Sequence, residues 1–164
     1  MKFLKYVMMI ISISMFLPIM TVYANGTEVG ERAPDFELTT IDGQQLRLSD
    51  FKGERVMINF WTTWCPPCRQ EMPDMQRFYQ DLQPNILAVN LTDTEMNREQ
   101  VVRFSQELEL TFPILLDEKG EVSKAYRISP IPTTYMIDSE GIIRHKSYGA
   151  LTYEQMIAEY NKME

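Results

Sequence analysis

The chain has 164 residues and a formal charge of −7, with 45% apolar and 11% aromatic residues. This apolar content argues against intrinsic disorder and is sufficient for one hydrophobic core. The acidic balance argues against nucleic acid as a partner, because binding to phosphates requires clustered Lys and Arg side chains. The composition therefore predicts one globular domain.

The first 24 residues differ from the rest of the chain. Lys2 and Lys5 are followed by 22 residues without a charged side chain, 6–27. Small residues near the end of this stretch suit a signal peptidase, and its length also approaches the ~20 residues of a membrane-spanning helix. We expect residues 1–24 to be a signal peptide or a membrane anchor, and residues 25–164 to form a domain outside the cytoplasm.

The next elements predict a hairpin and then a βαβ unit. A turn signal at 42–43 separates the short apolar segments 36–38 and 45–48, which predicts a small hairpin. The nearly continuous apolar runs 56–61 and 86–91 are typical of parallel strands buried on both faces. Between these runs, a helix is predicted by apolar side chains at helical spacing: Met72, Met75, Phe78, Tyr79 and Leu82.

The only two cysteines, Cys65 and Cys68, lie where the first predicted strand leads into this helix, in the motif Trp-Cys-Pro-Pro-Cys. A stabilising disulfide usually closes a longer loop, whereas a two-residue gap allows reversible thiol–disulfide exchange. Structural zinc would need four ligands, and the chain offers only these cysteines and His145. The pattern favours redox chemistry and predicts neither a metal nor a bound cofactor.

Further along the chain, helical and strand patterns alternate. A second helix is indicated by Val101, Val102, Phe104 and Leu108. A short strand is expected near 112–116, and 133–137 with 142–148 predicts a second hairpin. Thr152 and Gln155 have the spacing of a capping box that begins a last helix. The sequence thus predicts an α/β fold: a central mixed β-sheet flanked by helices, with an N-terminal β-hairpin extension and an inserted helix–strand element.

A wider set of motifs resembles a known family. It comprises Ala-Pro-Asp-Phe at 33–36, Leu-Ser-Asp-Phe-Lys-Gly at 48–53, Asn-Phe-Trp at 59–61, the cysteine motif and Ile-Pro-Thr-Thr at 131–134. This combination resembles the extracytoplasmic TlpA/ResA/StoA group of thiol-disulfide oxidoreductases, within the AhpC/TSA and thioredoxin superfamily, and its StoA-type members most of all. The resemblance implies a thioredoxin-like fold for residues 25–164.

The same resemblance implies a function and partners. The protein is expected to reduce disulfides in exported proteins, with spore-envelope proteins or apocytochrome c as the implied substrate classes. Electrons are expected from a membrane thiol carrier of the CcdA type. The implied location is the outer face of the cytoplasmic membrane, or outside the cell if the leader is cleaved.

The candidate catalytic residues are Cys65, Cys68 and Glu71. Cys65 is expected at a helix N-terminus, where free N–H groups and the helix dipole favour the thiolate, so we assign it as nucleophile. Cys68 would then resolve the mixed disulfide. Asn59 occupies the position of a buried Asp in thioredoxin, which leaves Glu71, about one turn after Cys68, as the acid–base group. The alternative for Glu71 is a charge on an exposed helix.

The candidate substrate-binding residues are Trp64, Ile131 and Pro132. An X-Pro bond adopts the cis form at low cost, and the resemblance places a cis-proline opposite the cysteines, with the Ile131 backbone facing the substrate. The alternatives are a trans proline at a strand start and a core position for Trp64.

Two other functions compete with this interpretation. A peroxiredoxin-type peroxidase shares the 33–36 motif, but Ile58 stands where its Pro-x-x-x-Thr-x-x-Cys pattern requires proline. A copper chaperone of the Sco type also uses two Cys and a His, yet with three residues between the cysteines instead of two. His145 in this chain falls in a predicted strand.

Overall fold

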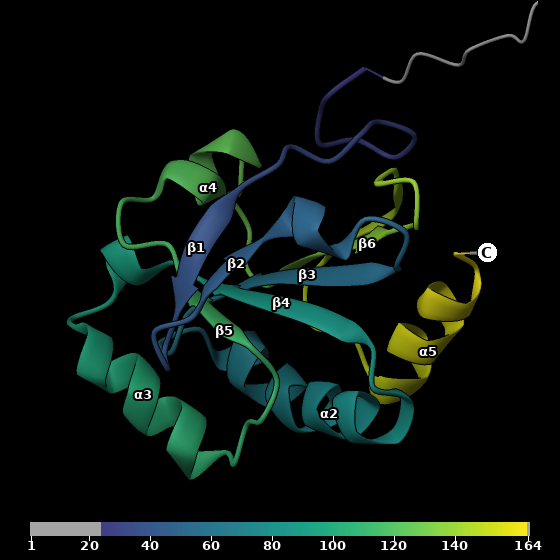
Figure 1. Cartoon of the computed structure of the whole chain (residues 1–164). Coiled ribbons are helices and arrows are strands. Elements are labelled where there is room, and N and C mark those ends of the chain that lie inside the picture. Colours follow the sequence, from purple (N-terminus) through teal and green to yellow (C-terminus); the bar gives the residue numbers. More distant parts are fainter. Residues whose placement is uncertain (1–23, 164) are drawn as a thin grey trace, which may run out of the picture.

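The structure is a computed structural model that describes residues 24–163. Its centre is a mixed sheet of seven strands in the order β2-β1-β5-β4-β3-β6-β7 (Figure 1). The strands are β1 (Glu37–Thr40), β2 (Gln45–Arg47), β3 (Val56–Trp61), β4 (Asn85–Asn90), β5 (Ile114–Leu116), β6 (Thr133–Ile137) and β7 (Ile143–Tyr148). The helices are α2 (Pro66–Leu82), α3 (Arg98–Glu107), α4 (Glu121–Ala125) and α5 (Tyr153–Asn161), with short 3-10 turns η1 (Leu48–Phe51) and η2 (Thr92–Thr94).

The strand pairing confirms the predicted thioredoxin-like arrangement. Strand β3 pairs with β4 in parallel across the α2 crossover, and β4 pairs with β5 in parallel. Strands β6 and β7 form an antiparallel hairpin that adds to the other side of β3. The N-terminal hairpin β1–β2 also joins the sheet, because β1 pairs antiparallel with β5.

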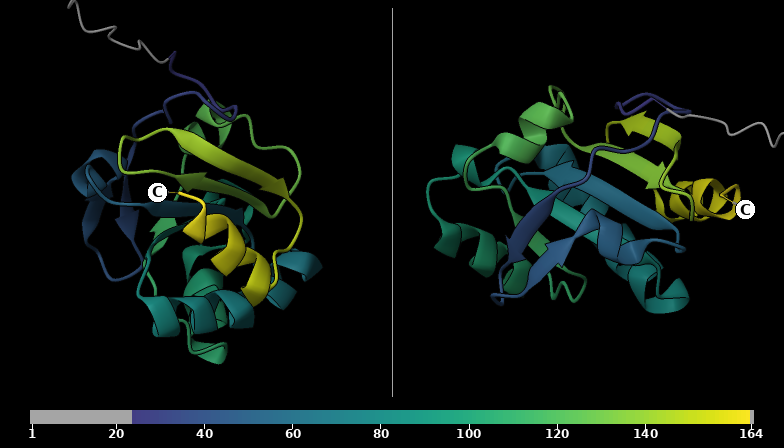
Figure 2. Two further views of the ribbon diagram at one scale, coloured as in Figure 1. Left: turned by 90° about the vertical axis from the view of Figure 1, so that its right-hand side faces the viewer. Right: turned by 45° about the horizontal axis from the view of Figure 1, so that its top comes forward.

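Each face of the sheet carries its own core. On β3, Met57 and Trp61 face the cluster formed with α2, α3 and α5, while Ile58 and Phe60 face the cluster that includes Tyr126 just after α4. Helix α5 lies beside α2 on the first face (Figure 2). Because side chains alternate along a strand, Asn59 shares the face of Met57 and Trp61 and points toward α2.

Two features of the chain ends and connections complete the description. The predicted leader, residues 1–24, lies outside the described residues except for Ala24. No helix within 24–163 combines the length and hydropathy needed to cross a bilayer. The five-residue helix α4 was not predicted, because so short a segment contains little more than one turn of periodicity.

Candidate active site

The two cysteines lie at the carboxyl end of β3, as predicted. Cys65 is the N-cap of α2, and Pro66 and Pro67 take the first two helical positions, where an N–H group would have no partner within the helix. Cys65 and Cys68 form a disulfide with their Cα atoms 5.3 Å apart. Their exposed fractions are 3% and 0%, so only Cys65 reaches the surface at all.

The N-terminus of α2 supplies one hydrogen-bond donor to the Sγ atom of Cys65. Because prolines have no N–H group, Cys68 carries the first N–H of α2, and it donates to the Cys65 Sγ at 3.2 Å. The positive end of the helix dipole acts on the same atom. Both effects stabilise negative charge on Cys65 once the disulfide is reduced.

Of the predicted substrate-binding residues, Ile131 and Pro132 come from a remote part of the chain, and Trp64 directly precedes Cys65. The Ile131–Pro132 peptide bond is cis, and the carbonyl oxygen of Ile131 lies 3.7 Å from the Cys65 Sγ. Trp64 is 55% exposed, so the alternative that it belongs to the core is wrong. The buried tryptophan of this region is Trp61, at the end of β3. The structure therefore brings the Ile131 backbone to Cys65 and leaves the adjacent Trp64 ring in solvent.

Glu71 lies inside the protein beneath the motif. It is 1% exposed, which excludes the alternative of a solvated charge on an exposed helix. Its Oε1 accepts a hydrogen bond from the Leu151 N–H at 3.0 Å, and its Oε2 accepts one from the Asn59 Nδ2 at 3.0 Å. Desolvation by burial outweighs these two hydrogen bonds and raises the pKa of Glu71 to about 7. The carboxyl group can therefore gain or lose a proton near neutral pH.

Asn59 connects Glu71 to the strand that follows the cis-proline. Its Nδ2 also donates to the Thr134 Oγ1 at 3.0 Å, while its Oδ1 is buried without a hydrogen-bond partner. If Glu71 is protonated, its O–H group can donate a hydrogen bond to the Asn59 Oδ1 once the Asn59 amide rotates to bring that oxygen toward Glu71. The sequence showed Asn59 only as a missing Asp, whereas the structure makes it a direct neighbour of the acid–base candidate.

Glu95 is a site residue that sequence reasoning missed. Its Oε1 accepts from the Thr63 N–H at 2.6 Å and from the Asn90 Nδ2 at 2.9 Å, and its Oε2 accepts from the Thr63 Oγ1 at 2.5 Å. These bonds join the segment after β4 to the loop immediately before the cysteine motif. No local sequence pattern could reveal them, because 32 residues separate Glu95 from Thr63.

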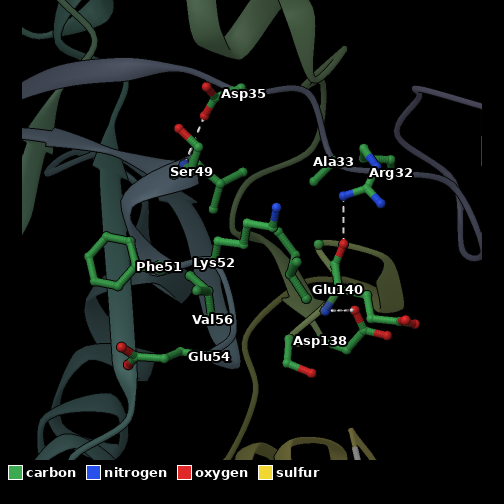
Figure 3. Close-up of a pocket in the computed structure, with 14 residues that line it drawn as sticks. Arg32, Ala33, Asp35, Ser49, Phe51, Lys52, Glu54, Val56, Asp138 and Glu140 are labelled. Atoms are coloured by element: carbon green, nitrogen blue, oxygen red, sulfur yellow. Dashed lines mark hydrogen bonds between the residues drawn. The ribbon is translucent and has the colours of Figure 1, made fainter.

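His145 and a cavity lined by residues of β3 and β6 both lie away from the cysteines. His145 is on β7, two strands from β3, with its Nδ1 3.2 Å from the Glu159 Oε2. A cavity of about 170 Å³ lies at the opposite end of β3, where Val56 begins that strand and Ile137 ends β6, and Lys52 is among the residues that line it (Figure 3). No cysteine lines this cavity, so it is separate from the redox site.

The fold and this site together define a thioredoxin-like redox protein with an active Cys-x-x-Cys pair. Residues 29–146 match the model of the AhpC/TSA family, and the chain belongs to that family. Its relatives include the thioredoxin-like protein YneN of Bacillus subtilis, 42% identical over 133 residues, which cover 80% of this chain and 78% of YneN. The thiol-disulfide oxidoreductase ResA of Geobacillus thermodenitrificans is 40% identical over 145 residues, covering 83% of this chain and 82% of ResA.

A solved structure supports the same assignment. The crystal structure of StoA from Bacillus subtilis matches with a TM-score of 0.70 and 37% identity, covering 77% of this chain and 96% of StoA. The expected resemblance to the ResA and StoA group is thus confirmed. The chain is a thiol-disulfide oxidoreductase, and the roles of its individual residues are proposed below.

Proposed function

We propose that this enzyme reduces disulfide bonds in exported proteins, with Cys65 as the nucleophile and Cys68 as the resolving thiol. The observation that carries this proposal is the placement of the Cys65 Sγ, which receives the Cys68 N–H at 3.2 Å and lies 3.7 Å from the Ile131 carbonyl oxygen. The N–H group favours the thiolate. The neighbouring backbone, together with the exposed Trp64 and the buried Pro132, gives an extended substrate segment a surface to lie on.

The reaction is a two-electron exchange in two steps. The Cys65 thiolate attacks one sulfur of the substrate disulfide, forms a mixed disulfide and releases the other substrate sulfur as a thiolate, which takes up a proton. Cys68 then loses its proton and attacks the Cys65 Sγ, which releases the second substrate thiolate. The substrate leaves with two thiols, and the enzyme keeps the Cys65–Cys68 disulfide.

Glu71 is proposed to handle the proton of Cys68 in the second step. Both side chains are buried on the same face of α2, three residues apart. A carboxyl group with its pKa raised to about 7 can accept a thiol proton and return it near neutral pH. This assigns proton transfer to Glu71 and leaves the Asn59 and Leu151 donors to orient it.

The cellular setting is also part of the proposal. We place the enzyme at the outer face of the cytoplasmic membrane, held by residues 1–24 or released after their cleavage. Its substrates would be spore-envelope proteins or apocytochrome c, and a CcdA-like membrane thiol carrier would return it to the dithiol form. These assignments rest on the resemblance to the ResA and StoA group.

The test is the equilibrium reduction potential of the Cys65–Cys68 pair in a defined thiol–disulfide buffer. A potential near or below about −270 mV, the value of thioredoxin, supports a reductase. A potential near about −120 mV, the value of the strong oxidant DsbA, would make the enzyme a disulfide donor and contradict the proposed direction. Failure to form a reversible disulfide would contradict the whole mechanism.

A further inference from the structure

Three polar side chains form a hydrogen-bonded row in the core beneath the cysteines. Thr134 on β6 lies directly opposite Asn59 on β3, and Glu71 reaches Asn59 from α2. Asn59 and Thr134 are 0% exposed, and Glu71 is 1% exposed. Buried polar groups are stable only where hydrogen bonds satisfy them, so the partners of each atom in this row determine which charge state it can hold.

Only the nitrogen end of the Asn59 amide has partners. Its Nδ2 donates one hydrogen bond to the Glu71 Oε2 and one to the Thr134 Oγ1, each at 3.0 Å, which uses both of its N–H groups. The Asn59 Oδ1 is buried and has no hydrogen-bond partner within residues 24–163. This arrangement satisfies an ionised Glu71, because a carboxylate can only accept hydrogen bonds.

A protonated Glu71 requires a different partner. Its Oε1 accepts the Leu151 N–H, and a backbone N–H cannot become an acceptor, so the proton belongs on Oε2. The new O–H group would then face the Asn59 N–H, and a buried donor without an acceptor is costly. Half a turn of the Asn59 amide about its Cβ–Cγ bond removes this conflict, because it exchanges Oδ1 and Nδ2, two atoms of similar size.

The Thr134 hydroxyl suits both orientations of this amide. A hydroxyl group can donate or accept a hydrogen bond. It accepts from the Asn59 Nδ2 in the structure, and it can donate to the Asn59 Oδ1 once the amide has turned. The amide therefore keeps one hydrogen bond to Glu71 and one to Thr134 whether Glu71 is ionised or protonated.

We propose that Asn59 and Thr134 are positioning residues for the resolving step: the Asn59 amide turns over as Glu71 gains or loses the Cys68 proton, and the Thr134 hydroxyl reverses its hydrogen bond. The inference rests on the proposed role of Glu71 in disulfide reduction and adds how a buried carboxyl group is satisfied in both charge states. The proton leaves the Cys68 Sγ and binds the Glu71 Oε2, while Asn59 and Thr134 neither gain nor lose one.

The charged groups around Glu71 allow its titration to be followed. Burial is the main cause of its raised pKa, and Asp74, three residues further along α2, adds a smaller increase. On α5, Glu154 is exposed, and Glu159 is paired with His145 of β7. The two strands contribute uncharged side chains to the row. Disulfide-bonded cysteines do not titrate, so the oxidised protein isolates Glu71 from the thiols.

The first experiment follows the Asn59 side-chain amide by NMR in the oxidised protein. Cross-peaks between its Nδ2 protons and the Thr134 Hβ should be strong when Glu71 is ionised and should weaken with a midpoint near pH 7 as Glu71 is protonated. The signals are identified by their loss in Asn59→Leu. In Glu71→Gln the cross-peaks should not change with this midpoint. The amide of Asn97, the N-cap of α3, is the internal control.

Variants test whether the row sets the proton affinity of Glu71. Asn59→Leu removes a donor to the carboxylate, so the midpoint, followed by the ¹³C signal of the Glu71 carboxyl group, should rise by about one pH unit. The resolving step at pH 7 should then slow about fivefold, because fewer molecules hold the ionised base.

Thr134→Val should raise the midpoint by less, since it leaves one Asn59 N–H without an acceptor only when Glu71 is ionised. Thr134→Ser keeps the hydroxyl and should restore the wild-type midpoint. This matched pair decides the question even if Asn59→Leu fails to fold. In each variant, the inflection of the resolving-step rate should move together with the NMR midpoint.

Three results would overturn the proposal. They are cross-peaks that stay unchanged through the Glu71 midpoint, a wild-type midpoint in Thr134→Val, and a loss of rate in Thr134→Val that is uniform at every pH, which would indicate a structural role alone. The proposed role of Glu71 is tested separately. If the cross-peaks changed as expected but Glu71→Gln resolved mixed disulfides like the wild type at every pH, the turning amide would stand and the catalytic role of Glu71 would be wrong.

Discussion

The Glu71 carboxylate and the Asn59 side-chain amide meet at 3.0 Å in the core beneath the cysteines. Asn59 comes from β3 and Glu71 from α2, and the second carboxylate oxygen holds the Leu151 N–H just before α5. One acidic group therefore joins the central strand, the active-site helix and the last helix. Its protonation state should influence both stability and catalysis.

Stability should depend on pH through Glu71. Burial raises the pKa of Glu71 from 4.5 to about 7 in the folded protein. Between these values the folded state holds a proton that the unfolded state has released, so the free energy of unfolding falls as pH rises through this window and levels off above it. Relative to Glu71→Gln, which cannot titrate, the wild type should lose roughly 3 kcal/mol across the window.

Urea unfolding of the oxidised proteins near about pH 5 and about pH 8 measures this difference. The exposed Glu118 supplies the control, because Glu118→Gln removes a solvated carboxylate and should run parallel to the wild type. If the difference in unfolding free energy between the wild type and Glu71→Gln were the same at both pH values, Glu71 would have the same pKa in the folded and unfolded chains.

Catalysis should show the same group at the resolving step. If Glu71 accepts the Cys68 proton, release of the second substrate thiol should accelerate as pH rises through about 7, where Glu71 ionises. Glu71→Gln should remove this inflection and slow the step on the order of 10²-fold. The first step, attack by Cys65, should change far less. Stopped-flow kinetics can measure the rates of both steps as a function of pH. If Glu71→Gln had the same pH–rate profile as the wild type, Glu71 would not be the acid–base group of the resolving step.

Much of this site follows from local sequence patterns. A nearly continuous apolar run ending at Trp61, followed by helical spacing from Met72 onward, is sufficient to place the cysteines at a strand–helix junction. The capping box of α5 was predicted from Thr152 and Gln155 and is present with both of its hydrogen bonds. Such features involve residues three or four apart, and sequence carries that information directly.

The surroundings of Glu71 could not be predicted in the same way. Its burial depends on Asn59, 12 residues earlier, and on Leu151, 80 residues later. Those distances are set by sheet register and by the docking of α5 against α2, which no short pattern encodes. The pairing of β1 with β5 also joins residues far apart in the sequence, because Thr39 pairs with Leu116.

The two cysteines should give opposite results when replaced. Cys65→Ser should abolish disulfide reduction, because no thiolate remains at the surface. Cys68→Ser should keep the first step and accumulate mixed disulfides between Cys65 and substrate, visible by mass spectrometry without reductant. If Cys65→Ser accumulated mixed disulfides with substrate, the roles of the two cysteines would have to be exchanged. If Cys68→Ser turned over normally, Cys68 would not be the resolving thiol.

Three hydrogen bonds to the Glu95 carboxylate, two from Thr63 and one from Asn90, form what we call the Glu95 clamp. This clamp should contribute measurably to the stability of the fold. Glu95→Ala deprives the Thr63 N–H and hydroxyl groups of their hydrogen-bond acceptor. It also leaves the buried Asn90 Nδ2 with only the Trp61 carbonyl oxygen as an acceptor, at 3.5 Å. Hydrogen bonds to a charged group are among the stronger ones, so the variant should lose about 2 kcal/mol of unfolding free energy. Glu99→Ala, at an exposed position on α3, should stay within about 0.5 kcal/mol of the wild type.

The same clamp should be detectable at the active site. Glu95→Gln keeps one carbonyl acceptor for Thr63, so it should recover part of the stability lost in Glu95→Ala. Because Thr63 precedes Trp64, loosening the clamp should also change the fluorescence quenching of the exposed Trp64 ring, with Trp64→Phe identifying its signal. Equal stabilities for Glu95→Ala and Glu99→Ala, with unaltered Trp64 quenching, would mean that the loop holds its position without Glu95.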